Sequence, residues 1–161
     1  MQKSILLKLA VVLLPLLMAA RAGAAEPEGV VSYTVKGDYF DIRLDLADAI
    51  INRGYVVDHE AMIGEMLNRT AGDVGAEKTV YANAEALQFC SAVVSRRAME
   101  ADPANIAFCP YVLFIYERAD QPGTVHLGFR RMPESGSEAS REALAAVNAL
   151  LDEIAREAAG Q

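Results

Sequence analysis

The chain has 161 residues, and its 22 acidic against 15 basic side chains give a formal net charge of -7 at pH 7. A surface this acidic repels phosphate backbones and anionic lipid, so nucleic acid is excluded as a natural partner. The length predicts one domain with one hydrophobic core that is large enough to be stable without disulfide bonds. The sequence contains no known catalytic motif, so whether the protein is an enzyme stays open at this point.

The N-terminus has the pattern of a cleavable signal peptide in residues 1–25. Lys3 and Lys8 precede an apolar run over residues 9–20, which is followed by Arg21 and four small residues. The run is shorter than the roughly 20 residues that span a bilayer core, so we expect no stable membrane anchor. We expect cleavage near Ala24 or Ala25 and a periplasmic or secreted product. Removing the three cations changes the formal charge to -10 for residues 26–161.

The first half of the mature chain is expected to alternate strand and helix. Residues 30–35 are β-branched and aromatic, which predicts a strand. Asp38 is placed to cap a helix that stops at Gly54, with apolar residues at helical spacing at Ile42, Leu46, Ala49 and Ile50. Residues 55–57 predict a second strand, and residues 59–70 predict a second helix.

The second half is expected to contain a short strand, a helix, two strands and a final helix. Residues 79–81 predict the short strand, and residues 84–101 consist of good helix formers with Cys90 on the core-facing stripe. Residues 106–117 are apolar on both alternating faces, as in a central strand. In residues 124–130 the apolar residues alternate with polar ones, which predicts a strand with one solvent-exposed face. Ser135 and Glu138 suggest a capping box before a helix whose apolar stripe is Leu144, Val147, Leu151, Ile154 and Ala158.

The stretch from Leu87 to Glu117 resembles the core of the family called domain of unknown function 302. It has the cysteine Cys90, the acid-proline step Asp102-Pro103, and an apolar strand that starts at Pro110 and closes with Tyr116-Glu117. The resemblance extends over about residues 30–158. It implies a two-layer α+β fold in which helices pack on a mostly antiparallel sheet, often paired as a homodimer. Many members place their second cysteine just after the strand's proline, whereas here Tyr111 holds that position and Cys109 precedes Pro110.

Cys90 and Cys109 are the only cysteines in the chain. A helix, a tight turn and a returning strand would allow the two side chains to meet, and an exported protein enters a compartment that permits disulfides. We expect an intramolecular disulfide, either structural or redox-active. The alternatives are two buried, inert thiols or ligands of a metal or haem.

The evidence for metal or haem binding in the sequence is slight, and no cofactor is expected. The Cys109-Pro110 step resembles a dipeptide that offers a thiolate to haem iron, but the C-x-x-C-H attachment pattern is absent. Met62 and Met66 lie near His59 and could bind a soft metal, although methionines at helical spacing usually fill a core. His59-Glu60 has no second histidine at the spacing that a zinc protease needs.

The basic pairs Arg96-Arg97 and Arg130-Arg131 offer an anion-binding alternative. We take Arg97 and Arg130 as candidates, because a guanidinium group matches carboxylate and oxyanion geometry. The simpler interpretation is that these arginines are solvated and paired with local acids. Ser91 and Ser95 have no base at a recognisable spacing, so hydrolase chemistry has no support.

The leading functional hypothesis is a small exported binding or accessory domain that uses its cysteine pair in thiol or sulfur redox chemistry. Its partner would be a small molecule or a protein in the periplasm. One alternative is an enzyme that binds an anionic small molecule between sheet and helices. The others are a metal- or haem-binding protein and a purely structural homodimer.

Overall fold

The computed structural model describes residues 27–161, so the predicted signal peptide lies outside the described residues. The strands form one five-stranded antiparallel sheet in the order β1-β5-β4-β3-β2. Their bounds are Val30–Lys36 for β1, Val57–Ala61 for β2, Tyr81–Phe89 for β3, Tyr111–Arg118 for β4 and Thr124–Arg130 for β5. The predicted α+β class and antiparallel sheet are confirmed.

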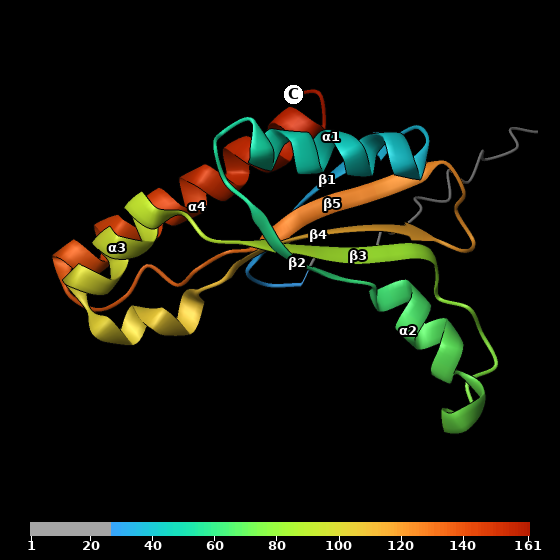
Figure 1. Cartoon of the computed structure of the whole chain (residues 1–161). Coiled ribbons are helices and arrows are strands. Elements are labelled where there is room, and N and C mark those ends of the chain that lie inside the picture. Colours follow the sequence, from blue (N-terminus) through green and yellow to red (C-terminus); the bar gives the residue numbers. More distant parts are fainter. Residues whose placement is uncertain (1–26) are drawn as a thin grey trace, which may run out of the picture.

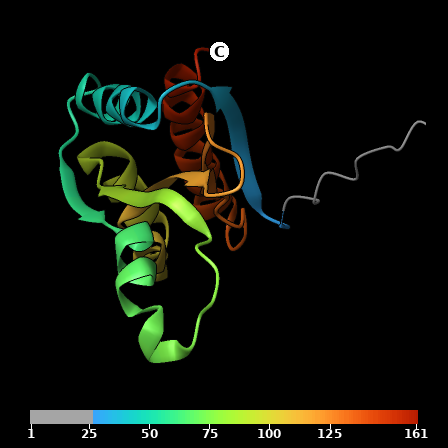
Figure 2. The ribbon, with the colours of Figure 1, turned by 90° about the vertical axis from the view of Figure 1, so that its right-hand side faces the viewer.

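Two helices cover one face of the sheet. In Figure 1, α1 (Tyr39–Ile51) and α4 (Glu138–Ala158) lie together above the strands, whereas α2 (Ile63–Thr70) lies below them. Helix α3 (Ala92–Ala101) packs on α4 beyond the end of the sheet and is followed by the 3₁₀ segment η2 (Pro103–Phe108). Figure 2 shows α2 and the short 3₁₀ turn η1 (Gly72–Val74) extending away from the rest of the domain.

The core lies between the sheet and the pair α1 and α4. Strand β4 is the middle strand of the sheet, and its residues Tyr111, Leu113 and Ile115 are buried against the helices. The predicted stripe of α4 is buried as well and meets the apolar face of β5, with Leu144, Val147, Leu151, Ile154, Ala158, Val125, Leu127 and Phe129 in one cluster. The prediction of a central strand within residues 106–117 is therefore correct for β4.

The opposite face of the sheet is only partly covered. Val112, Phe114 and Tyr116 of β4 point to this open face and are half-buried. Helix α2 approaches the sheet closely at Gly64, where an added Cβ would lie 2.8 Å from the backbone nitrogen of Ala84 on β3. The glycine thus permits a contact at β3, while β4 and β5 keep part of this face accessible.

The predicted helix over residues 84–101 is wrong in its first half. Residues 84–89 belong to β3, and the helix begins only at Ala92. The three alanines in Tyr81–Phe89 favour a helix locally, but β3 pairs on both sides, with β4 and β2, and this pairing overrides the propensity. Cys90 consequently lies in a turn and is exposed, instead of facing the core from a helix.

Other boundaries also differ from the expectations. Residues 59–61 extend β2, so α2 starts at Ile63, and residues 106–108 are part of η2, so β4 starts at Tyr111. The cap of α4 is Ser137, whose side chain accepts a hydrogen bond from the Ser140 backbone, and the predicted capping box at Ser135 is wrong. The Asp38 cap of α1 is confirmed by hydrogen bonds from the backbone nitrogens of Phe40 and Asp41.

Within residues 27–161 no helix is long and apolar enough to cross a membrane.

Candidate functional site

The two cysteines lie at one end of the sheet, where β3 leaves it and β4 enters it. Cys90 follows the last residue of β3 and precedes Ser91, which caps α3. Cys109 lies between η2 and β4, and its bond to Pro110 is a cis peptide. Phe89 and Tyr111 face each other in the β3–β4 pairing, so the sheet itself brings the two cysteine-bearing turns together.

The two sulfur atoms are in contact. Both residues are free thiols in the structure, and their Sγ atoms are 2.9 Å apart at hydrogen-bonding distance. A disulfide bond has a length of about 2.05 Å, so a small movement would allow the bond to form. The expected proximity of Cys90 and Cys109 is confirmed, whereas the disulfide itself stays a prediction.

Ser95 and Tyr111 form the inner wall beside Cys109. Ser95 lies one helical turn after the cap of α3, and its Oγ is 3.8 Å from the Cys109 Sγ. The same hydroxyl donates a hydrogen bond of 3.1 Å to the Tyr111 hydroxyl oxygen. Burial raises the pKa of Tyr111, so its phenol stays protonated at neutral pH. This side of the pair is polar but closed, since both Ser95 and Tyr111 are buried.

The outer thiol, Cys90, is held in its protonated form. Loss of water contact around its sulfur raises the pKa of Cys90 to about 11, helped by the hydrogen bond to Cys109 and by the charges of Cys109 and Asp58. A hydrogen bond from the Tyr111 backbone opposes this shift. Cys90 is therefore an exposed but protonated thiol in hydrogen-bonding contact with Cys109, and it is not an activated thiolate.

The predicted anion-binding arginines lie on different elements. Arg97 is on the exposed side of α3 and forms an ion pair of 3.4 Å with Glu142. Arg130 is the exposed last residue of β5 and has no ion pair among residues 27–161. A broad hollow lies on the open face, lined among others by Thr34, Tyr116 and His126, and neither arginine lines it. Arg97 thus matches the simpler interpretation of a solvated, paired side chain.

Of the candidates for metal binding, His59 lies on β2, Met62 is the N-cap of α2 and Met66 lies within α2. Among the described residues no group of three or more His, Cys, Asp or Glu side chains is placed to hold a metal ion. Met62 and Met66 are exposed at 41 and 43 %, so the expectation that they fill the core is wrong.

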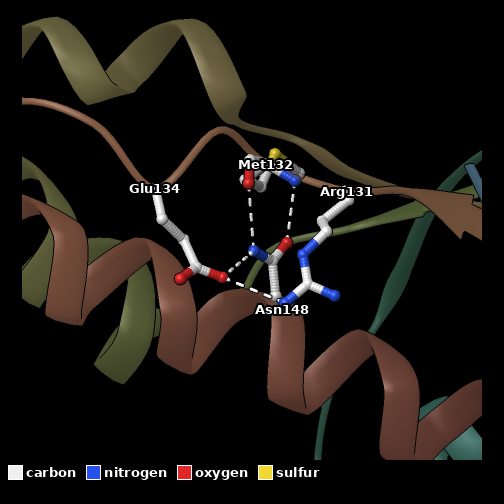
Figure 3. Close-up of polar contacts among 4 residues, drawn as sticks. All are labelled: Arg131, Met132, Glu134 and Asn148. Atoms are coloured by element: carbon white, nitrogen blue, oxygen red, sulfur yellow. Dashed lines mark hydrogen bonds and ion pairs between the residues drawn. The ribbon is translucent and has the colours of Figure 1, made fainter. Parts of the chain in front are cut away.

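Two buried polar clusters connect the layers away from the cysteines. In one, Glu85 of β3 accepts hydrogen bonds from the Tyr39 hydroxyl at 3.1 Å and from Arg43 at 3.0 Å, which ties α1 to the sheet. In the other, Asn148 of α4 binds both backbone groups of Met132, as Figure 3 shows. Both clusters are satisfied internally, and we assign them to stability.

Three residues beside the cysteines could not be identified from the sequence. The sequence shows Ser95 as a serine without a recognisable base, gives no signal for Asp58, and draws attention to Tyr111 only through its place beside Cys109 and Pro110. The three residues lie beside the cysteines only because β3 pairs with β4. The helix predicted over residues 84–101 is incompatible with this pairing. The sequence signal for one of them, Tyr111, is that it directly follows Cys109 and Pro110.

Comparisons with known proteins agree with this architecture. The family model described as "Domain of unknown function DUF302" matches residues 31–159. The chain is also similar in fold to a crystal structure of an uncharacterized conserved protein DUF302 from Bacillus stearothermophilus, with a TM-score of 0.67 and 16% sequence identity over 82% of this chain and 99% of that chain. No curated protein matches the chain. The chain therefore belongs to the DUF302 family, a domain family of unknown function.

Proposed function

We propose that this protein is an exported thiol–disulfide exchange domain in which Cys90 and Cys109 alternate between a dithiol and a disulfide. The observation that carries the proposal is the 2.9 Å contact between two free thiols, one of which is exposed at the surface. Reaction of a thiol with a disulfide requires that the attacking sulfur be reachable, and Cys90 meets this requirement.

The reaction proceeds in two exchanges. The thiolate of one cysteine attacks a partner disulfide, forms a mixed disulfide and releases one partner sulfur as a thiol. The second cysteine then attacks the mixed disulfide, which forms the Cys90–Cys109 bond and releases the other partner sulfur. The domain loses two electrons and two protons, and the partner disulfide gains them to become two thiols.

The surrounding fold supports a reversible pair better than a structural bridge. The flanking residues Phe89 and Tyr111 are already joined by strand pairing, and both are buried. Because the sheet holds the two turns together without a bond, the domain keeps its shape in either redox state. Inert thiols would be expected to be buried, whereas Cys90 is exposed.

The experiment is a redox titration of the mature protein in mixtures of reduced and oxidised dithiothreitol. Alkylation at each point and intact-mass analysis should show a single reversible transition between two modified cysteines and none. Cys90→Ser and Cys109→Ser variants should each keep one modified cysteine throughout. Two alkylated cysteines under every condition would disprove the proposal.

The proposed location is the periplasm or the medium, supported by the signal-peptide pattern of residues 1–25. We expect a mature N-terminus at Ala25 or Glu26, and intact-mass analysis of protein from each cell fraction will identify it. Recovery of the uncleaved chain from membranes would show instead that the apolar run is an anchor.

A further inference from the structure

The surroundings of the cysteine pair carry an unusual share of the exposed apolar side chains. The most exposed large apolar residues of the described chain are Val93 at 78 %, Val74 at 75 %, Val56 at 70 %, Phe40 at 65 % and Ile106 at 64 %. Three of these five flank the cysteines. Val93 is three residues after Cys90, and Ile106 is three residues before Cys109.

Backbone contacts place Ile106 and Val56 beside the site. The carbonyl oxygen of Ile106 accepts a hydrogen bond of 3.1 Å from the Cys109 backbone nitrogen. Val56 precedes Val57, which pairs with Phe89 next to Cys90. Pro110, between Cys109 and β4, is exposed as well. We call Val56, Val93, Ile106 and Pro110 the apolar collar of the dithiol.

The charge at the collar is negative. Asp58 is exposed and close enough to Cys90 to raise its pKa. The nearest cations along α3 are already paired, Arg96 with Glu100 at 3.5 Å and Arg97 with Glu142 at 3.4 Å. The whole chain is acidic in addition, with a formal charge of -7 that removal of residues 1–25 makes more negative. An anionic disulfide such as oxidised glutathione is therefore repelled from Cys90.

We propose that the partner of the dithiol is a polypeptide whose disulfide is flanked by apolar and basic residues, and not glutathione. This inference rests on the proposed exchange function and specifies its substrate. Exposed apolar side chains around a reactive centre provide contacts that a small polar disulfide cannot use, but an extended peptide segment can. Asp58 adds an attraction for a basic residue next to the partner cysteine.

The first test compares three small disulfides with the reduced protein: cationic cystamine, neutral hydroxyethyl disulfide and anionic oxidised glutathione. Oxidation is followed by alkylation and intact mass. Cystamine should react on the order of tenfold faster than oxidised glutathione at low salt, and Asp58→Asn should reduce this ratio. Equal rates for the two charged disulfides would overturn the charge preference.

The second test uses two disulfide-linked peptides of equal positive charge that carry either leucine or serine beside the cysteine. The leucine peptide should react several-fold faster, and Val93→Ser and Ile106→Ser should remove this advantage. Val74→Ser is the matched control, because Val74 is 75 % exposed but lies on η1. Equal rates for the two peptides would disprove the role of the collar.

Hydroxyethyl disulfide distinguishes a failure of exchange from a failure of partner preference, because it is neutral and carries no apolar side chain. If the protein does not react even with this compound, the exchange function itself is wrong. If it reacts with this compound but shows neither preference, exchange stands and the polypeptide partner is wrong.

Discussion

At the residue scale, the protonation of Cys90 is set chiefly by burial of its sulfur and by the sulfur of Cys109. With a pKa of about 11, Cys90 is a thiolate in only about one molecule in ten thousand at pH 7. A dithiol without a stabilised thiolate favours the disulfide state and gives up electrons readily, unlike pairs whose reduced form is stabilised by a low thiol pKa. The pair is therefore expected to act as a reductant toward its partner.

Replacing Cys109 by serine should lower the pKa of Cys90 toward its ordinary value. The hydrogen bond to Cys109 and the charge of its sulfur both raise the pKa of Cys90, and the variant removes the ionisable sulfur, whereas the effect of burial remains. The pH dependence of Cys90 alkylation by iodoacetamide measures this. The variant should reach half of its maximal rate at a lower pH than the Cys90 thiol of the reduced wild-type protein, whose rate should still be rising at pH 10.

Asp58→Asn provides a smaller shift in the same direction, since the charge of Asp58 also raises the pKa of Cys90. An unchanged alkylation profile in Cys109→Ser would mean that burial alone controls the pKa of Cys90.

The two cysteines could be named as candidates from the sequence because they are the only ones present. The exposure and the neighbours of the two cysteines could not be predicted from the sequence. They depend on the connection after β3, and the alanines of β3 wrongly predict a helix there.

At the element scale, β4 separates two environments. Leu113 faces the helices and is fully buried, whereas Phe114 faces the open side of the sheet and is half-buried. The ring of Phe114 lies over β5, where a Cβ added to Gly128 would be 3.0 Å from its outermost carbon. The alternation of apolar residues thus predicts a central strand correctly, but it cannot tell which of the two faces a helix covers.

Leu113→Ala and Phe114→Ala should therefore lower the free energy of unfolding by different amounts. Leu113→Ala should lower the free energy of unfolding by about 2 to 5 kcal/mol through lost burial and a cavity. Phe114→Ala should cost only roughly 1 to 2 kcal/mol, because its ring keeps solvent on one side. Urea unfolding at protein concentrations low enough to keep the chain monomeric measures both. A larger loss for Phe114→Ala would mean that its face is covered within the monomer.

Helix α4 is fixed to the chain that precedes it by Asn148. Its side chain accepts a hydrogen bond of 2.7 Å from the Met132 nitrogen and donates bonds of 3.0 and 3.1 Å to the Met132 and Glu134 oxygens (Figure 3). An asparagine in the middle of a helical pattern gives no sign of this contact, because its partner is backbone. The helix and its buried stripe are predictable from the sequence, whereas the attachment of the β5–α4 connection is not.

Asn148→Ala should destabilise the domain by roughly 2 to 4 kcal/mol, because it leaves two buried backbone groups of Met132 without partners. Thermal or urea unfolding measures the change. Glu134→Ala is the control, since it removes only exposed contacts, the one to the same amide and the ion pair with Arg131, and should have little effect. Equal losses in the two variants would place the stabilisation in the surface contacts instead.

At the scale of the whole molecule, the open face of the sheet carries a stack of aromatic rings on an otherwise acidic chain. Its stacked rings Phe114, Tyr116 and His126 are half-buried, with centroids 6.1 Å apart for the first pair and 4.8 Å for the second. The hollow there is lined by Lys78 and Arg118 besides Asp120, whereas the carboxylate of Glu85 points to α1 on the other side of the sheet. This face does not share the strong negative charge of the chain.

We therefore predict that the homodimer implied by the family resemblance forms through this face. Sedimentation velocity over a range of concentrations should show a monomer–dimer equilibrium. Added salt should strengthen the dimer by screening the repulsion between the acidic copies. Phe114→Asp should shift the equilibrium to monomers, because it puts an unpaired carboxylate into the apolar centre of the contact. Phe40→Asp, on the outer side of α1 where Phe40 is 65 % exposed, should leave the dimer intact. If Phe40→Asp dissociates the dimer and Phe114→Asp does not, the contact is made by α1, and the open face is left to another partner.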